Sequence, residues 1–255
     1  MKRIWMMTVL SIKDSLRTKA WIPFFIMSVL AWFPMLIGFG YQMRPNSFAD
    51  NIISNYFQFL SLGIWFSGLI LGATSVFMER RASLMFTLPI SRTELAVGKL
   101  LGTQIVVGAG LLVGYLISLA FAVHFGLSRF TYSHLGLATA FSLSFTYICL
   151  SIPLGFWLSP IWTILTTYLV IEAPWTLQAL VSEGWITNNW IVGLNALLQK
   201  VAPGQLDRVP MAKAFYNKYV FVGDYTGVAR NAMIAIIVFM LLVSLARNKE
   251  LSLKS

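Results

Sequence analysis

Long uncharged hydrophobic stretches alternate along the chain with short polar segments rich in Lys and Arg. Residues 20–43, 51–78, 100–128 and 130–171 contain no Asp, Glu, Lys or Arg, and a shorter apolar run covers 231–246. A helix needs about 20 apolar residues to cross the core of a bilayer. The first three stretches each have room for one such helix, and the fourth has room for two. The pattern therefore predicts an all-α membrane protein with six transmembrane helices.

Proline and glycine divide the longest uncharged stretch and set the predicted boundaries. Pro153, Gly155, Ser159 and Pro160 interrupt it, because Pro and Gly end helices or start turns. We place the spans at about residues 21–41, 53–78, 100–124, 135–156, 161–180 and 228–246.

Residues 182–226 form the longest segment between predicted spans. Trp190, Leu194, Leu197 and Val201 keep helical spacing within it and predict a helix that lies against or dips into the membrane.

Composition and charge support a membrane location. The 255 residues are 58% hydrophobic and only 11% charged, against about 25% charged in a typical soluble domain, which argues against a soluble enzyme. Of 19 Lys and Arg, 12 lie in residues 1–19, 79–99 and 247–255. Cytoplasmic loops carry such an excess. We therefore expect both termini in the cytoplasm, the chain in the inner membrane, and the net charge of +10 to serve topology and not nucleic-acid binding.

The first 19 residues predict an amphipathic helix. Trp5, Val9, Ile12 and Leu16 fall on one stripe, among several Lys and Arg. Such a helix lies in the headgroup plane near anionic lipid. The alternative is a positively charged flank whose periodicity is accidental.

The most charged internal segment is residues 79–99. Residues 79–87 predict a short amphipathic helix with Leu84, Met85 and Leu88 as apolar contacts, and Pro89 stops it. Ser91-Arg-Thr-Glu94 then fits a capping box, so the next helix begins before its membrane span. The alternative is a solvated loop with ordinary capping and positive-inside charges.

These motifs together resemble the type-2 ATP-binding-cassette (ABC-2) exporter permeases. The resemblance rests on Glu79, Leu84, Leu88-Pro89-Ile90-Ser91-Arg92 and Gly98-Lys99-Leu100-Leu101-Gly102, and on Lys13-Asp14-Ser15-Leu16-Arg17 near the N-terminus. The motifs cover about 40 residues, whereas the six-span count agrees over nearly the whole chain.

The resemblance implies a permease subunit, with residues 20–255 as its six-span domain, that pairs with a second permease chain and two cytosolic ATPase subunits. Whether the two permease chains are identical stays open. Residues 182–226 would match an external re-entrant segment, and residues 1–19 a connecting helix with Lys13, Asp14 and Arg17. Residues 79–89 would match the coupling helix, within a coupling segment of residues 79–99. The expected ATPase contacts are Glu79, Arg80, Arg81, Leu84, Met85, Leu88, Pro89 and Arg92.

The chain itself carries no recognisable chemistry for ATP hydrolysis. Thr93 stands where a P-loop needs Gly, and Leu100 follows Lys99 where it needs Ser or Thr. We expect no enzyme activity, cofactor or metal here, and ATP with Mg in the partner ATPase. The rival functions are a non-transporting scaffold or sensor that recruits a cytosolic protein, and an intramembrane enzyme, which would need two polar groups at one depth.

Glu172 is the acidic residue expected at membrane depth. Such groups are costly and usually face a cavity or a partner, which favours a substrate path or gate. In the alternative, Pro174 and Trp175 mark a kink near the outer interface and Glu172 reaches water. Two G-x-x-x-G pairs, at 68 and 72 and at 110 and 114, predict close helix packing within the chain or at a dimer seam.

Overall fold

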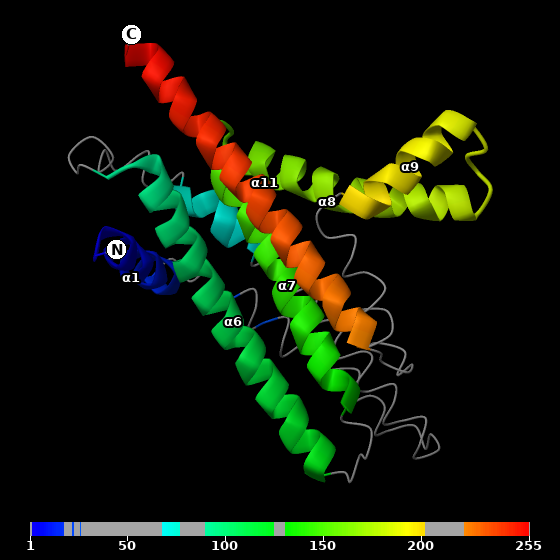
Figure 1. Cartoon of the computed structure of the whole chain (residues 1–255). Helices are drawn as coiled ribbons and strands as arrows, with labels where there is room; N and C mark the ends of the chain where they lie inside the picture. The colour runs from blue at the N-terminus through cyan, green and yellow to red at the C-terminus, as the bar shows by residue number, and fades with distance from the viewer. Residues whose placement is uncertain are drawn as a thin grey trace.

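The computed structural model describes residues 2–17, 22, 26, 68–76, 90–124, 131–201 and 222–254. All regular structure in these residues is helical. The helices are α1 (Lys2–Arg17), α6 (Arg92–His124), α7 (Thr131–Leu154), α8 (Pro160–Ser182), α9 (Asn189–Val201) and α11 (Val222–Lys254), and residues 68–76 form a further helical segment (Figure 1).

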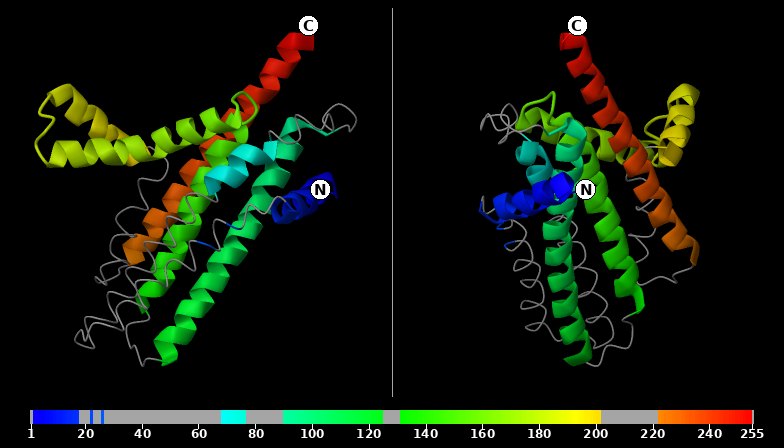
Figure 2. Two further views of the ribbon diagram at one scale, coloured as in Figure 1. Left: turned by 180° about the vertical axis from the view of Figure 1, so that it is seen from behind. Right: turned by 60° about the vertical axis from the view of Figure 1, so that its left-hand side comes forward.

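Three helices, α6, α7 and α11, lie side by side as a bundle (Figure 1). Helix α7 runs antiparallel to α6 and parallel to α11, so α6 begins where α7 ends, and the second half of α11 passes the same place (Figure 1). We call this the Arg92 end of the bundle. Helix α1 lies across α6 at this end, as both views in Figure 2 show.

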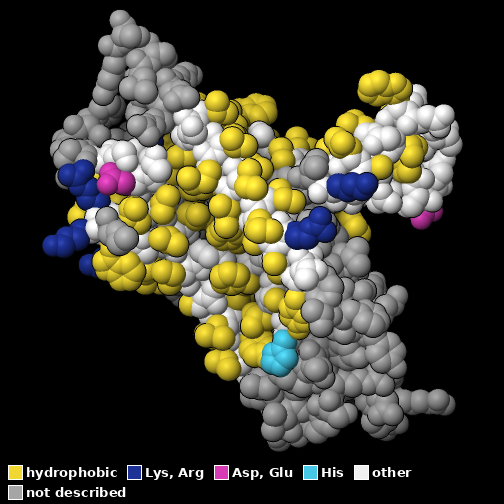
Figure 3. Space-filling view, viewed as in Figure 1, with side chains coloured by type: hydrophobic (Ala, Val, Ile, Leu, Met, Phe, Trp, Pro, Cys, Tyr) yellow, Lys and Arg dark blue, Asp and Glu magenta, His cyan; other side chains and the backbone are white. Residues whose placement is uncertain are grey.

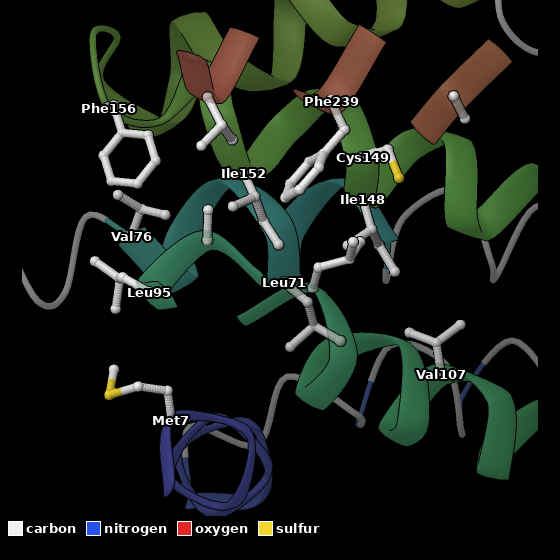
Figure 4. Close-up of a cluster of buried hydrophobic side chains, with 14 of the residues drawn as sticks. Met7, Leu71, Val76, Leu95, Val107, Ile148, Cys149, Ile152, Phe156 and Phe239 are labelled. Carbon is white, nitrogen blue, oxygen red and sulfur yellow. The ribbon is translucent and has the colours of Figure 1, made fainter. Parts of the chain in front are cut away.

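Helix α7 is the centre of the packing. Its side chains Ile148, Cys149 and Ile152 belong to a buried cluster that also takes Met7 from α1 and Phe239 from α11 (Figure 4). A helix that is apolar on all sides is expected inside a bundle. The elements that surround α7 are therefore held by one shared core.

Among the described residues, four helices are long and apolar enough to cross a membrane. These are Arg92–Leu116, Leu137–Leu154, Pro160–Ser182 and Tyr225–Ala246, which coincide with the third to sixth predicted spans. The first predicted span lies almost wholly outside the described residues, as does most of the second. The part that the structure describes is thus all-helical with four candidate membrane-spanning helices, and the total of six spans stays a prediction.

Helices α6 and α11 are longer than their predicted spans. Each has 33 residues, about 50 Å at 1.5 Å per residue, whereas the bilayer core is about 30 Å thick. The charged tail expected after residue 246 continues α11 to Lys254. Both helices therefore extend into the polar zone around the membrane.

The predicted break before the fifth span is present. Turns follow α7 from residue 155, Ser159 is the N-cap of α8, and Pro160 is its first residue. Proline suits that position because its ring presets helical φ and the missing N–H has no helical partner there. From this point α8 diverges steeply from the bundle instead of packing along its full length (Figure 2).

Helices α8 and α9 form a helical hairpin. Gly184 ends α8 with φ 75°, and Trp185 N–H donates to Leu180 O at 3.0 Å, which is a Schellman motif. Asn188 then caps α9 by accepting from Trp190 N–H at 2.9 Å. The helix predicted within residues 182–226 is confirmed, and its contact with the membrane stays a prediction.

Candidate functional site

The predicted coupling region is only partly described. Glu79, Arg80, Arg81, Leu84, Met85, Leu88 and Pro89 lie outside the described residues. The structure does describe Arg92 at the start of α6 and the whole of α1. The candidate site is therefore the junction of these two helices, which we call the α1–α6 junction.

The capping box at the start of α6 is confirmed. Glu94 N–H donates to Ser91 Oγ at 3.2 Å, and Ser91 N–H donates to Glu94 Oε2 at 3.0 Å. These bonds satisfy backbone donors that a helix start otherwise leaves free. The helix therefore starts at a fixed residue, directly after the predicted coupling segment.

The side chain of Arg92 joins the start of α6 to α11 and to the turn that follows α7. Its Nη1 donates to Ala246 O of α11 at 3.2 Å, and its guanidinium carbon lies 5.8 Å from the centroid of the Phe156 ring. A guanidinium over an aromatic face is attracted by the ring quadrupole. Arg92, predicted as an ATPase contact, is thus engaged by groups of its own chain.

Helix α1 crosses α6 at two glycines. A Cβ added to Gly98 would lie 2.4 Å from Met7 Cβ, and one added to Gly102 would lie 2.5 Å from Ser11 Cβ. Atoms cannot approach so closely, so any side chain at either position would push α1 away. Gly98 and Gly102 are four residues apart, the spacing that lets helix backbones meet in membrane proteins.

A buried lysine pairs with α1 between these glycines. Lys99, whose side chain is 1% exposed, places Nζ 3.3 Å from Asp14 Oδ2. The Asp14 side chain is 55% exposed. Because a buried ammonium is costly unless it is paired, Asp14 fixes the position of α1 along α6 as well as balancing the charge.

A small polar cavity adjoins this ion pair. It has a volume of about 30 Å³ and lies between α1, α6 and the helical segment 68–76, which contributes Leu71, Thr74 and Ser75. Ser11 Oγ is buried there with no hydrogen-bond partner. A cavity of this size and polarity accommodates about one or two water molecules, which would satisfy such a group.

The two ends of the predicted apolar stripe of α1 are exposed, and its middle residues Val9 and Ile12 are half-buried. Trp5 is 66% and Leu16 54% exposed, whereas the small or polar residues Thr8, Ser11 and Ser15 are buried. Lys13 and Arg17 are exposed beside the stripe. This arrangement leaves Trp5, Leu16 and the basic side chains available to lipid or to a partner protein.

Sequence reasoning did not select Lys99 as a site residue, nor Gly98 and Gly102 as a packing pair. The G-x-x-x-G spacing was the available signal for the glycines. For Lys99, the signal was a charged residue next to an apolar span. Neither signal identifies α1 as the partner.

Glu172 is buried on α8 and accepts a hydrogen bond from Tyr147 of α7. It is 6% exposed, and Tyr147 Oη donates to Glu172 Oε1 at 2.5 Å. The carboxylate thus faces a partner within the chain, as acidic groups in membrane proteins usually do. This placement does not match the alternative in which Glu172 reaches water. A role in a path or gate stays a prediction.

Hydrogen bonds between polar side chains join α7 to α6 and α11. The sequence analysis did not select these residues. Asn231 of α11 donates to Ser142 Oγ at 3.2 Å and to Thr146 Oγ1 at 3.0 Å. Gln104 of α6 donates to Ser144 Oγ at 3.3 Å. Isolated amides within apolar spans were the signal, because such groups bond across helices.

The first predicted glycine pair packs inside the chain. A Cβ on Gly72 would overlap Ser151 Oγ of α7, and one on Gly68 would lie 3.5 Å from Tyr147 Cβ. The interpretation as packing within the chain is confirmed for this pair. For the second pair, Gly114 is buried and Gly110 half-buried.

The described residues hold no group of three or more His, Cys, Asp or Glu side chains placed to bind a metal ion. No protein-family model matches the chain, and no curated protein matches its sequence. Its function is therefore argued from the junction and the sequence motifs.

Proposed function

We propose that this chain is the transmembrane permease subunit of an ATP-binding-cassette exporter of the ABC-2 type. It forms a dimer with a second permease chain in the inner membrane and couples to two cytosolic ATPase subunits. Both termini and the Arg92 end of the bundle face the cytoplasm in this proposal. ATP and Mg are bound by the ATPase.

The observation that carries the proposal is the rigidity of the α1–α6 junction. Two glycines bring the backbones into contact, a buried ion pair fixes their register, and a capping box begins α6 directly after residues 79–89. A push on residues 79–89 would therefore move α1 and α6 as one body. Rigid-body movement of this kind changes access to a path between two subunits.

The first test is purification of the full chain, tagged and in mild detergent, from its native host. We expect an ATPase to copurify in stoichiometric amount and to be identified by mass spectrometry and by ATP hydrolysis. Glu79→Lys and Arg81→Glu should release it, because they reverse charges in the segment proposed to dock. Lys200→Glu on α9 is the matched control, since it reverses a charge in the segment that the proposal places outside the cell.

Two results would count against this function. Recovery of the intact chain without any ATPase would contradict the permease assignment, and a non-ATPase cytosolic partner in its place would favour the scaffold alternative. An ATPase that stays bound to both variants would show that docking occurs elsewhere.

A further inference from the structure

A large apolar groove lies between α6 and α11, with α7 as its floor. Its volume is about 930 Å³, and its lining is almost entirely hydrocarbon. Figure 3 shows the hydrophobic side chains that cover this face of the bundle. Pockets that bind small molecules have volumes of about 300 to 1,000 Å³ and similar linings. The groove is therefore large enough for a ligand and is shaped for an apolar one.

Small residues on all three helices create the hollow. Gly108 lines it from α6, Ala138 from α7, and Ala229 and Ala232 from α11. A Cβ on Gly108 would already lie 3.0 Å from the Phe141 ring. A leucine at the alanine positions would fill space that is now open.

Polar groups gather at one end of the groove. His134 and Tyr225 line it three residues after α7 and α11 begin, at the end opposite Arg92. His134 Nδ1 is hydrogen-bonded to Tyr115 Oη at 2.7 Å. Phe145 and Ile236 line the groove nearer the middle of the helices. Tyrosines favour the membrane interface, so this polarity matches a headgroup outside and a hydrocarbon chain inside.

The length of the groove matches one leaflet. From His134 to Phe145 and from Tyr225 to Ile236 the helices rise about 16 Å each, which is about half of a 30 Å bilayer core. A transmembrane helix from another protein would cross both leaflets and would need a longer groove. The dimensions therefore favour a lipid over a protein helix.

We propose that this groove binds one resident phospholipid, with an acyl chain between α6 and α11 and its headgroup near His134 and Tyr225. The lipid belongs to the leaflet at the end of the bundle opposite Arg92, which is the outer leaflet in the topology proposed above. The proposal requires only that the bundle spans a membrane. It does not depend on coupling to an ATPase, and this lipid is not the transported cargo.

The test uses the full chain in phosphatidylcholine vesicles that contain a small fraction of a phospholipid with a photoreactive diazirine in one acyl chain. After illumination, peptide mass spectrometry should find label concentrated on residues 137–145 and 229–236. The double variant Ala138→Leu with Ala232→Leu should reduce this label several-fold. Ala109→Leu, on the exposed side of α6 next to Gly108, should not reduce it.

Ala229→Leu, at the exposed rim of the groove, is a second variant that changes the core less and should also lower the label. Tryptophan fluorescence during heating checks that each variant is folded. Equal labelling of Ile237 and Leu241 on the exposed side of α11, unchanged by the groove variants, would overturn the proposal. Crosslinks from the groove to a second protein chain in place of lipid would overturn it as well.

Discussion

Lys99 and Asp14 are 85 residues apart in the chain, and only the packing of α1 on α6 brings them together. The two partners differ in environment, because the lysine is buried and the aspartate is about half exposed. Loss of one partner from a buried pair costs about 3 to 5 kcal/mol, and water access to the other partner reduces that figure. The pair is therefore asymmetric, and the lysine is the residue whose charge needs compensation.

We expect Asp14→Asn to destabilise the protein by about 1 to 3 kcal/mol, because it removes the carboxylate beside a buried ammonium. Lys99→Met should cost less, since methionine fills similar space without a charge. Combining the two changes should restore most of the loss. Thermal unfolding of the purified chain in detergent measures the order of the three variants. A double variant less stable than Asp14→Asn alone would show that the ion pair does not explain the effect.

At the scale of elements, two glycines in the α8–α9 hairpin should respond in opposite ways to substitution by alanine. Gly184 ends α8 with φ 75°, a conformation that costs other residues about 1 to 2 kcal/mol. Gly193 lies inside α9, where an added Cβ would meet nothing within 4 Å. Where neither a positive φ nor a close neighbour requires glycine, a glycine inside a helix makes the helix less stable than alanine would, by about 0.5 to 1 kcal/mol.

Gly184→Ala should therefore speed hydrogen exchange of the α9 amides, whereas Gly193→Ala should slow it. The prediction concerns local opening of the hairpin, so exchange followed by mass spectrometry suits it better than global unfolding. The same direction of change in both variants would mean that the turn at Gly184 does not control the hairpin.

Features set by neighbouring residues were predictable, and features set by distant contacts were not. The capping box at Ser91 and the break at Pro160 depend on local backbone chemistry, so the sequence indicated both. For α1, the apolar stripe predicted the helix but not its buried side. Gly98 meets Met7, and Gly102 meets Thr8 and Ser11, so these residues of α1 face inward while Trp5 faces outward.

At the scale of the whole molecule, the direction of α8 relative to the bundle is the feature that hydropathy could not predict. Its 23 residues are apolar enough to span a bilayer, yet it diverges from α6, α7 and α11 (Figure 2). A helix of that composition either crosses the membrane at a tilt or lies along its surface. The two cases place the turn between α8 and α9 on opposite sides of the membrane.

We predict that α8 crosses, because its 23 residues are long and apolar enough to span a bilayer and Glu172 pairs with Tyr147 of α7 on its buried side. Single cysteines at Ser91, Ser159 and Thr187, all exposed, report the outcome in a Cys149→Ala background. A membrane-impermeant maleimide added to intact cells should label Thr187 and should reach Ser91 and Ser159 only after permeabilisation. Labelling of Thr187 only after permeabilisation would contradict this prediction and place α8 on the inner surface of the membrane. Of the described helices, only α6, α7 and α11 would then cross. The proposed exporter would also lack an external hairpin formed by α8 and α9.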